Sequence, residues 1–200
     1  MTESSPAPLR KIARISLAVL AAAVALIVIG RMLPGGPEPR RDTRSVLERP
    51  WDTTAVLGLT LASPGRFQPI TVPVPAEVRT SIDWMESWGR NAGETEMRVS
   101  RMEYKPNVPL SLDGSAQGAI DAMRVNPAVA SLTHSHARVQ VSGIPAVRTT
   151  SRFLVTGRPA HGEILTVLRG RTLWQLQVLG PEGEAPEIAR RMLESVRVQP

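Results

Sequence analysis

The stretch LRGRTLWQLQVLGP, Leu168–Pro181, decides the fold of the segment around it. Two alternating apolar runs meet at Gly170-Arg171, and glycine in the first of two loop positions suits a type II′ hairpin turn. With that turn Val167 pairs with Trp174, so both strands place apolar side chains on one face. The pattern predicts an antiparallel hairpin with strands at about 162–169 and 172–179.

Further strands and helices are expected on both sides of this hairpin. Period-two alternation predicts strands, and apolar residues at i, i+4 and i+7 predict helices. The expected strands are 56–61, 70–74, 96–104, 132–141 and 146–156, and the expected helices are 76–89, about 111–125 and one that starts at Ala185. This order predicts one α+β domain over 51–200, in which an antiparallel sheet is flanked by helices.

Composition and charge narrow the classes of function. The chain has 200 residues, 42% of them hydrophobic and 21% charged, which is a globular composition. It has no cysteine, so disulfides and thiolate metal sites are excluded. The net charge is +6, but residues 1–44 hold seven basic and three acidic side chains, so most of the excess precedes the domain. A nucleic-acid-binding domain would carry that excess itself, and we expect no nucleic acid as a partner.

An apolar stretch near the start predicts a membrane anchor. Residues 15–30 read ISLAVLAAAVALIVIG, without a charge, and a helix over 12–33 would be roughly 33 Å long, enough to cross a bilayer. The side chains expected in lipid are Ile15, Leu17, Val19, Leu20, Val24, Leu26, Ile27, Val28 and Ile29. A cleaved signal peptide is the alternative, but small residues at its cleavage positions are missing.

The anchor prediction implies a layout for the whole chain. Residues 1–11 form a short basic tail, 12–33 a transmembrane signal-anchor helix, and 34–50 a linker rich in proline, glycine and arginine. Membrane lipid is then a partner, and the domain lies outside the cytoplasm at the inner membrane. The opposite orientation stays open, because basic residues flank the apolar stretch on both sides.

The C-terminal half resembles the PsbP-like fold. The resemblance rests on a Gly-x-Pro-Ala hairpin entry at 143–146, the Gly170 hairpin that leads to an aromatic strand, and a terminal helix that ends in Glu194-Ser195-Val196. This group includes the extrinsic oxygen-evolving protein of photosystem II, a Ran-binding nuclear transport factor and many bacterial lipoproteins. The resemblance implies a sheet sandwiched by helices and a protein that binds or stabilises others. It transfers no site residue to this chain.

Two histidines are the sharpest chemical feature. His134 and His136 lie two residues apart in a predicted strand, so both side chains project from one face, as two metal ligands would. A metal site needs a third ligand, and only His161 or a carboxylate such as Glu163 remains. The alternative interpretation is a polar, solvated sheet face.

Three arginines form a second candidate site. If Val141 pairs with Val147, then Arg148 and Arg152 join Arg138 and the two histidines on one face. Such a cationic patch could bind an acidic protein, a carboxylate or an anionic lipid. Ordinary surface arginines paired with carboxylates are the alternative.

Two tryptophans form the third candidate. Trp84 and Trp88 are one turn apart on the expected helix 76–89, beside its apolar stripe. They predict either an interaction ridge or the margin of the core.

No catalytic motif is present in the sequence, and no cofactor is expected. Gly114-Ser-Ala-Gln-Gly118 has its serine in the second position, unlike a nucleophile elbow, and no phosphate-binding loop appears. We therefore expect a membrane-tethered, non-catalytic domain that binds another protein of the bacterial envelope. A metal-dependent hydrolase that uses His134 and His136, and a carrier of lipid or another small ligand, are the competing hypotheses.

Overall fold

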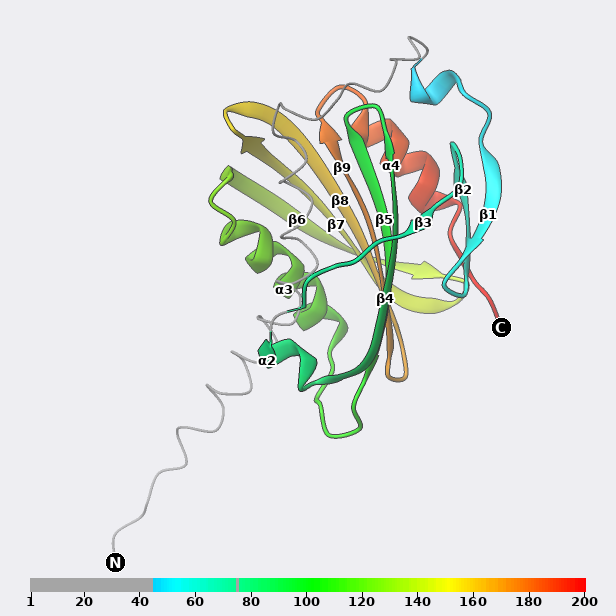
Figure 1. Cartoon of the computed structure of the whole chain (residues 1–200), viewed down its shortest axis with the longest axis vertical. Coiled ribbons are helices and arrows are strands. Elements are labelled where there is room, and N and C mark those ends of the chain that lie inside the picture. Colours follow the sequence, from blue (N-terminus) through cyan, green and yellow to red (C-terminus); the bar gives the residue numbers. More distant parts are fainter. Residues whose placement is uncertain (1–44, 75) are drawn as a thin grey trace, which may run out of the picture.

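The computed structural model describes residues 45–74 and 76–200, and these form two antiparallel sheets (Figure 1). The small sheet has the order β1-β2-β10, and the large sheet has the order β3-β4-β5-β9-β8-β7-β6. The strands are β1 Asp52–Val56, β2 Leu59–Ser63, β3 Gln68–Pro69, β4 Ile82–Ala92, β5 Thr95–Tyr104, β6 Val129–Val141, β7 Ile144–Val155, β8 Arg158–Arg169, β9 Thr172–Pro181 and β10 Arg197–Val198. The helices are a 3₁₀ turn at Val46–Glu48, α2 Ala76–Arg79, α3 Leu112–Arg124 and α4 Ala185–Glu194.

The predicted hairpin around Gly170 is confirmed, including its register. Val167 pairs with Trp174, as the sequence indicates, and Gly170 has a φ of 62°. A different two-residue turn closes the β6–β7 hairpin, where both Ser142 and Gly143 have positive φ, the conformation of a type I′ turn.

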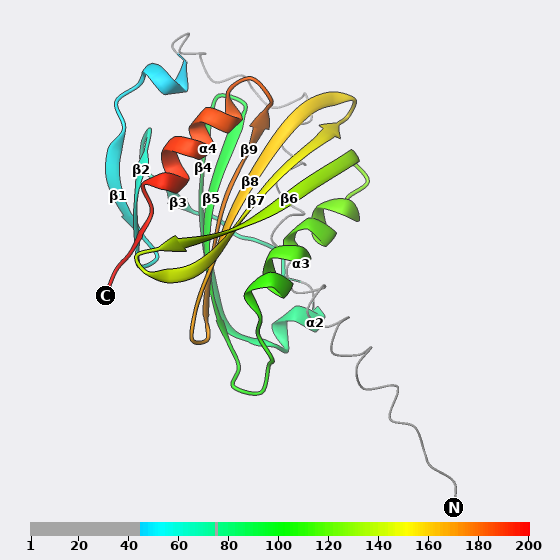
Figure 2. The same ribbon diagram turned by 180° about the vertical axis from the view of Figure 1, so that it is seen from behind.

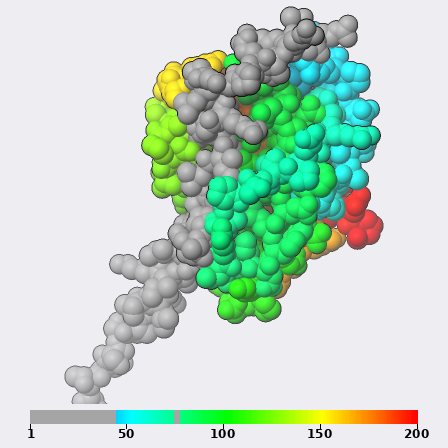
Figure 3. Space-filling model, in the orientation of Figure 1, coloured from blue at the N-terminus to red at the C-terminus, as the bar shows by residue number. Residues whose placement is uncertain are grey.

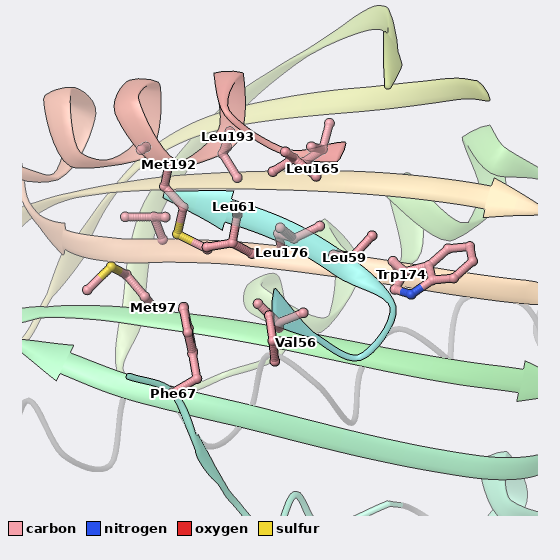
Figure 4. Packing of buried hydrophobic residues seen from close by; sticks show 14 of the residues in the cluster. Val56, Leu59, Leu61, Phe67, Met97, Leu165, Trp174, Leu176, Met192 and Leu193 are labelled. Carbon is pink, nitrogen blue, oxygen red and sulfur yellow. The ribbon is translucent and has the colours of Figure 1, made fainter. Parts of the chain in front are cut away.

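One face of the large sheet packs against α4 and the small sheet, and we call it the α4 face. Figure 2 shows α4 beside β1 and β2. Its core contains Leu165, Trp174 and Leu176 from the large sheet, Leu59 and Leu61 from β2, and Met192 and Leu193 from α4 (Figure 4). Proline in the first turn and Ile188, Ala189, Met192 and Leu193 on one stripe explain why the chain forms a helix here.

The opposite face packs against α3, and we call it the α3 face. The side chain of Ser111 accepts a hydrogen bond from the backbone N–H of Gly114 and so caps the start of α3. Ala119, Ile120 and Met123 then bury against Phe153, Val155, Ile164 and Leu179 of the sheet. A separate apolar cluster, with Val78, Met102, Tyr104 and Leu173, closes the other end of this face.

The predicted fold class is wrong on its main point. The sequence predicts an α+β sandwich preceded by a transmembrane helix, whereas strands make up more than half of the described residues and only two of their helices, α3 and α4, exceed four residues. No helix within 45–74 and 76–200 is long and apolar enough to cross a bilayer. The predicted tail, the anchor 12–33 and residues 34–44 of the linker lie outside the described residues.

The expected helix at 76–89 accounts for most of this error. Only α2 is helical there, and β4 follows it and pairs with β5 along its length. The apolar stripe that favoured a helix has a different origin. Val78 of α2 and Ile82 and Met85 of β4 meet in one cluster across a turn.

Three further boundaries differ from the sequence expectation. Residues 70–74 form no strand, and the short β3 lies just before them. The expected strand 56–61 is interrupted by a turn at Leu57-Gly58, where both residues have positive φ, so β1 and β2 form a hairpin. Residues 45–50, assigned to the linker, belong to the packed body, because Val46 is buried and the indole N–H of Trp51 donates to its carbonyl.

Candidate binding site

The structure brings His134 and His136 together, and the residues that it describes supply no third metal ligand beside them. Both lie on the α3 face of β6, and their ring centroids are 5.1 Å apart. His136 bonds to the hydroxyl of Thr149 at 2.8 Å and to Gln117 of α3 at 3.3 Å. Burial, with a contribution from the charge of His134, lowers the pKa of His136. No group of three His, Asp or Glu side chains that could hold a metal occurs among residues 45–74 and 76–200.

The three candidate arginines do not share a face. The β6–β7 register pairs Val141 with Ile144, not with Val147, so Arg148 lies opposite Ala137. Arg148 and Arg152 therefore lie on the α4 face, and Arg138 lies on the α3 face with the histidines. The predicted cationic surface is wrong in this respect, because the two-residue turn at Ser142-Gly143 shifts the register by an odd number.

Each of these arginines has a carboxylate partner. Arg138 lies 2.5 Å from Asp113 of α3, and Arg152 lies 3.5 Å from Glu182. Arg148 lies 2.6 Å from the buried carboxylate of Glu163. The pairs of Arg138 and Arg152 fit the alternative that the sequence left open, surface arginines matched with carboxylates, whereas Arg148 pairs with a buried carboxylate.

Sequence reasoning missed the buried ionic cluster around Glu163. The Nε2 of His161 lies 3.1 Å from one carboxylate oxygen of Glu163, and Arg148 donates to the other. Burial alone would raise the pKa of Glu163, but the hydrogen bonds from His161 and Arg148 hold it below its ordinary value. His161 is 4% exposed, so its ring is beyond the reach of a substrate in solution. The cluster is therefore placed to hold β7 and β8 together.

The two candidate tryptophans are on strand β4, where they have different environments. Both lie on the α4 face, opposite Glu103 and Val99 of β5. Trp88 packs against the core, and its indole N–H donates to Glu86 at 2.6 Å. Trp84 is 43% exposed and, with Val125, is one of two exposed large apolar side chains in the described part of the chain.

Arginines and tryptophans alternate beside Trp84. The guanidinium carbon of Arg101 lies 5.4 Å from the Trp84 ring centroid and 5.7 Å from that of Trp174, and that of Arg169 lies 5.5 Å from Trp174. These distances are typical of cation–π contacts. We call Trp84, Arg101, Trp174 and Arg169 the Trp–Arg stack.

The stack is anchored in the core at one end and exposed at the other. Trp174 is 1% exposed, and its indole N–H donates to the carbonyl of Leu57 at 2.8 Å. Arg101 holds Trp84 against this fixed residue, and strand pairing of β4 with β5 holds its backbone. The edge of the sheet with β3 and β4 is at the surface of the molecule (Figure 3). The result is an exposed aromatic ring on a rigid support.

Only part of the stack could be found in the sequence. Trp84 was singled out for its residue type, but the assignment of β4 as a helix hid its cross-strand neighbours. The alternation of β5 does place Arg101 with Val99 on one face, yet its stacking on Trp174 depends on the β5–β9 pairing, which joins distant segments.

Comparison with known proteins gives no assignment by sequence. No family model matches the chain, and no curated protein matches it. The solved structures that resemble it in shape include three with the following values. A protein of unknown function from Pseudomonas aeruginosa, PA94, a putative regulator, has a TM-score of 0.40 and 11% identity over 68% of this chain and 87% of its own.

The other two structures are equally distant. LpqN, involved in cell envelope biogenesis of Mycobacterium tuberculosis, has a TM-score of 0.43 and 12% identity over 75% of this chain and 83% of its own. A protein from Bacteroides thetaiotaomicron has a TM-score of 0.40 and 9% identity over 72% of this chain and 46% of its own. Such values assign neither a fold family nor a function, and the PsbP-like resemblance is not confirmed.

Proposed function

We propose that this chain is a non-catalytic binding domain that docks on another protein of the bacterial envelope through the surface around Trp84. The exposure of Trp84 on the rigid Trp–Arg stack is the observation that carries the proposal. Tryptophan and arginine dominate the residues that contribute most to protein–protein affinity, because they bury large area and also make directed polar contacts.

The chemistry of this surface defines the partner. The Trp84 ring offers apolar area, and the exposed Arg169 offers a guanidinium that also donates to the carbonyl of Gln199. Across from Trp84, Glu103 accepts a hydrogen bond from the hydroxyl of Thr172, so its charge is already engaged within the sheet. The fitting partner presents an apolar or aromatic side chain to Trp84, with a carboxylate in reach of Arg169.

The envelope location rests on the sequence alone. The apolar residues 15–30 support it, and they lie outside the described residues. A fusion of alkaline phosphatase to the C-terminus tests it, because this enzyme is active only outside the cytoplasm. Phosphatase activity is the expected result, and an inactive but stable fusion would contradict this part of the proposal.

Photo-crosslinking from position 84 tests the docking surface directly. A photoreactive phenylalanine analogue replaces Trp84 in cells, and the same analogue replaces Val125, the other exposed apolar residue, as a matched control. We expect a discrete crosslinked protein from position 84 only. The purified partner should then bind Trp84→Ala more than about tenfold more weakly than Val125→Ala. Equal crosslinking from both positions, or equal affinities of the two variants, would contradict the proposal.

A further inference from the structure

Strand β6 forms one edge of the large sheet and has β7 as its only strand neighbour among the described residues. Its residues 133–140 are exposed or half-buried, and Figure 2 shows β6 as the last strand of the sheet. The opposite edge ends in β3, a two-residue strand that contains Pro69. Short strands and proline protect an edge from pairing with another chain, but residues 133–141 include neither proline nor lysine. The β6 edge is therefore open to a further strand.

The register of the β6–β7 hairpin shows which backbone groups of β6 face outward. Val141 and Ile144 flank a two-residue turn, so they form a hydrogen-bonded pair, and such pairs alternate with non-bonded pairs along an antiparallel ladder. The residues that bond to β7 are therefore the odd-numbered ones from 133 to 141. The backbone N–H and C=O groups that point away from β7 are those of His134, His136, Arg138 and Gln140. These groups offer donors and acceptors to another strand.

This open stretch has a defined beginning and end. Ser131 has a φ of 54°, and the register shifts between Ala130 and Thr133, so a bulge precedes the stretch. At the other end Val141 is 6% exposed and leads into the turn that closes the hairpin. The regular stretch is therefore 133–141, and its middle residue is Ala137.

The side chains of this stretch are self-complementary in one antiparallel register, which has a two-fold axis at its middle residue. The facing pairs are then Ala137 with its own copy, Ser135 with Val139, Thr133 with Val141, His134 with Gln140, and His136 with Arg138. Small and β-branched side chains meet on the α4 face, as suits a cross-strand contact. Burial lowers the pKa of His136, so its ring is neutral at pH 7, and no like charges face each other across the axis.

Charge favours a second copy over a charged strand of another protein. Arg138 is the only Asp, Glu, Lys or Arg in 133–141, and it already pairs with Asp113 of α3. An acidic strand would compete with Asp113 for Arg138, and a basic strand would meet Arg138 as a like charge. A second copy brings its own Asp113 for its own Arg138, so the charges at the joined edge stay balanced.

From this geometry we propose that two copies of the chain pair through β6, antiparallel and with the two-fold axis at Ala137, so that their large sheets join into one. The outward backbone groups of the even-numbered residues 134–140 make the hydrogen bonds between the copies. Strand β4, which carries Trp84, lies toward the opposite edge of the sheet, so the dimer leaves both Trp84 surfaces free. Dimerisation through β6 is therefore independent of docking at Trp84.

Disulfide crosslinking of the full chain tests the pairing, because the unmodified chain contains no cysteine. Ala137→Cys lies on the axis, where the facing Cα atoms of a non-hydrogen-bonded pair are about 4.5 Å apart, within the range of a disulfide. Ser135→Cys, also exposed and on the same face, is the control, because its two copies would lie roughly 14 Å apart. Under a mild oxidant we expect a covalent dimer from Ala137→Cys only. No dimer from Ala137→Cys, or equal yields from both variants, would overturn the proposal.

Two substitutions of His136 separate backbone pairing from side-chain contacts. His136→Pro removes an N–H that faces outward and leaves the N–H groups that bond to β7 in place, whereas His136→Ala keeps the outward N–H. In sedimentation of the full chain in mild detergent, we expect the unmodified protein and His136→Ala to be dimers. The dissociation constant of His136→Pro should be higher by about tenfold or more, because the two-fold axis doubles the loss of the hydrogen bond. A monomeric unmodified protein, or equal constants for the two variants, would contradict the pairing.

Discussion

Strand β9 is buried on both faces of the large sheet, but the two faces are differently built. On the α4 face, Trp174, Leu176 and Val178 of β9 pack into one continuous apolar core. On the α3 face, the intervening Gln175 and Gln177 separate two apolar clusters. One strand thus contributes to a core that stabilises the fold and to a pair of buried glutamines whose amides have no partner in the described chain. Burial alone therefore does not identify the residues that stabilise this protein.

The largest expected effect is on the α4 face, at Trp174. Trp174→Ala removes a side chain that is 1% exposed, its hydrogen bond to Leu57 and its contacts with Arg101 and Arg169. We expect a loss of about 4 kcal/mol in the free energy of unfolding, measured by urea denaturation. A loss below about 1 kcal/mol would mean that the small sheet does not depend on this residue.

The ionic cluster at Glu163 should give a smaller, pH-dependent effect. Glu163→Gln removes the charge that pairs with Arg148 and changes the group that bonds to His161, and we expect it to lower the unfolding free energy at neutral pH by about 2 kcal/mol. The folded state holds the pKa of Glu163 below its ordinary value. The ionised carboxylate therefore contributes its full stability at any pH above the ordinary pKa, and this stability is lost as the pH falls through the lower pKa of the folded state.

Measuring the unfolding free energy of the unmodified protein and of Glu163→Gln at several pH values tests this expected direction. The stability gap between the unmodified protein and Glu163→Gln should narrow as the pH falls below about 4.3, the ordinary pKa of a glutamate. A gap that widens in acid would mean that the carboxylate is not stabilised by its partners.

A smaller effect than that of Glu163→Gln is expected at the start of α3. Ser111→Ala removes the cap that accepts from the N–H of Gly114, and a loss of about 1 kcal/mol is expected from thermal unfolding. Ser111→Asp, which can cap in the same way, serves as the control and should restore the stability. Equal losses in both variants would exclude a capping role.

The sequence predicts best those features whose turn residues and strands are neighbours in the chain. The Gly170 hairpin was predicted with its register, because turn residues and alternation agree over fourteen neighbouring residues. The β6–β7 register was not, because the Ser142-Gly143 turn signal was passed over in favour of a longer loop. The helix expected at 76–89 failed because a stripe formed across a turn looks like a helical period.

The burial of Gln175 and Gln177 was beyond sequence reasoning for a different reason. The alternation LWQLQVL shows that Gln175 and Gln177 share a face, but an alternating strand normally turns its polar side chains to water. Only tertiary contacts show that these glutamines are buried. The Trp–Arg stack likewise required the pairing of β5 with β9, whose partners lie far apart in the chain.

The comparison between the faces is tested most directly by two neighbouring substitutions in β9. Leu176 and Gln177 are 0% and 2% exposed, and they point to opposite faces. Urea unfolding of Leu176→Ala should show a loss of about 3 kcal/mol, whereas Gln177→Ala should lose less than about 1 kcal/mol. Equal losses from the two substitutions would contradict the account, because the glutamine would then stabilise the fold as much as the core leucine does.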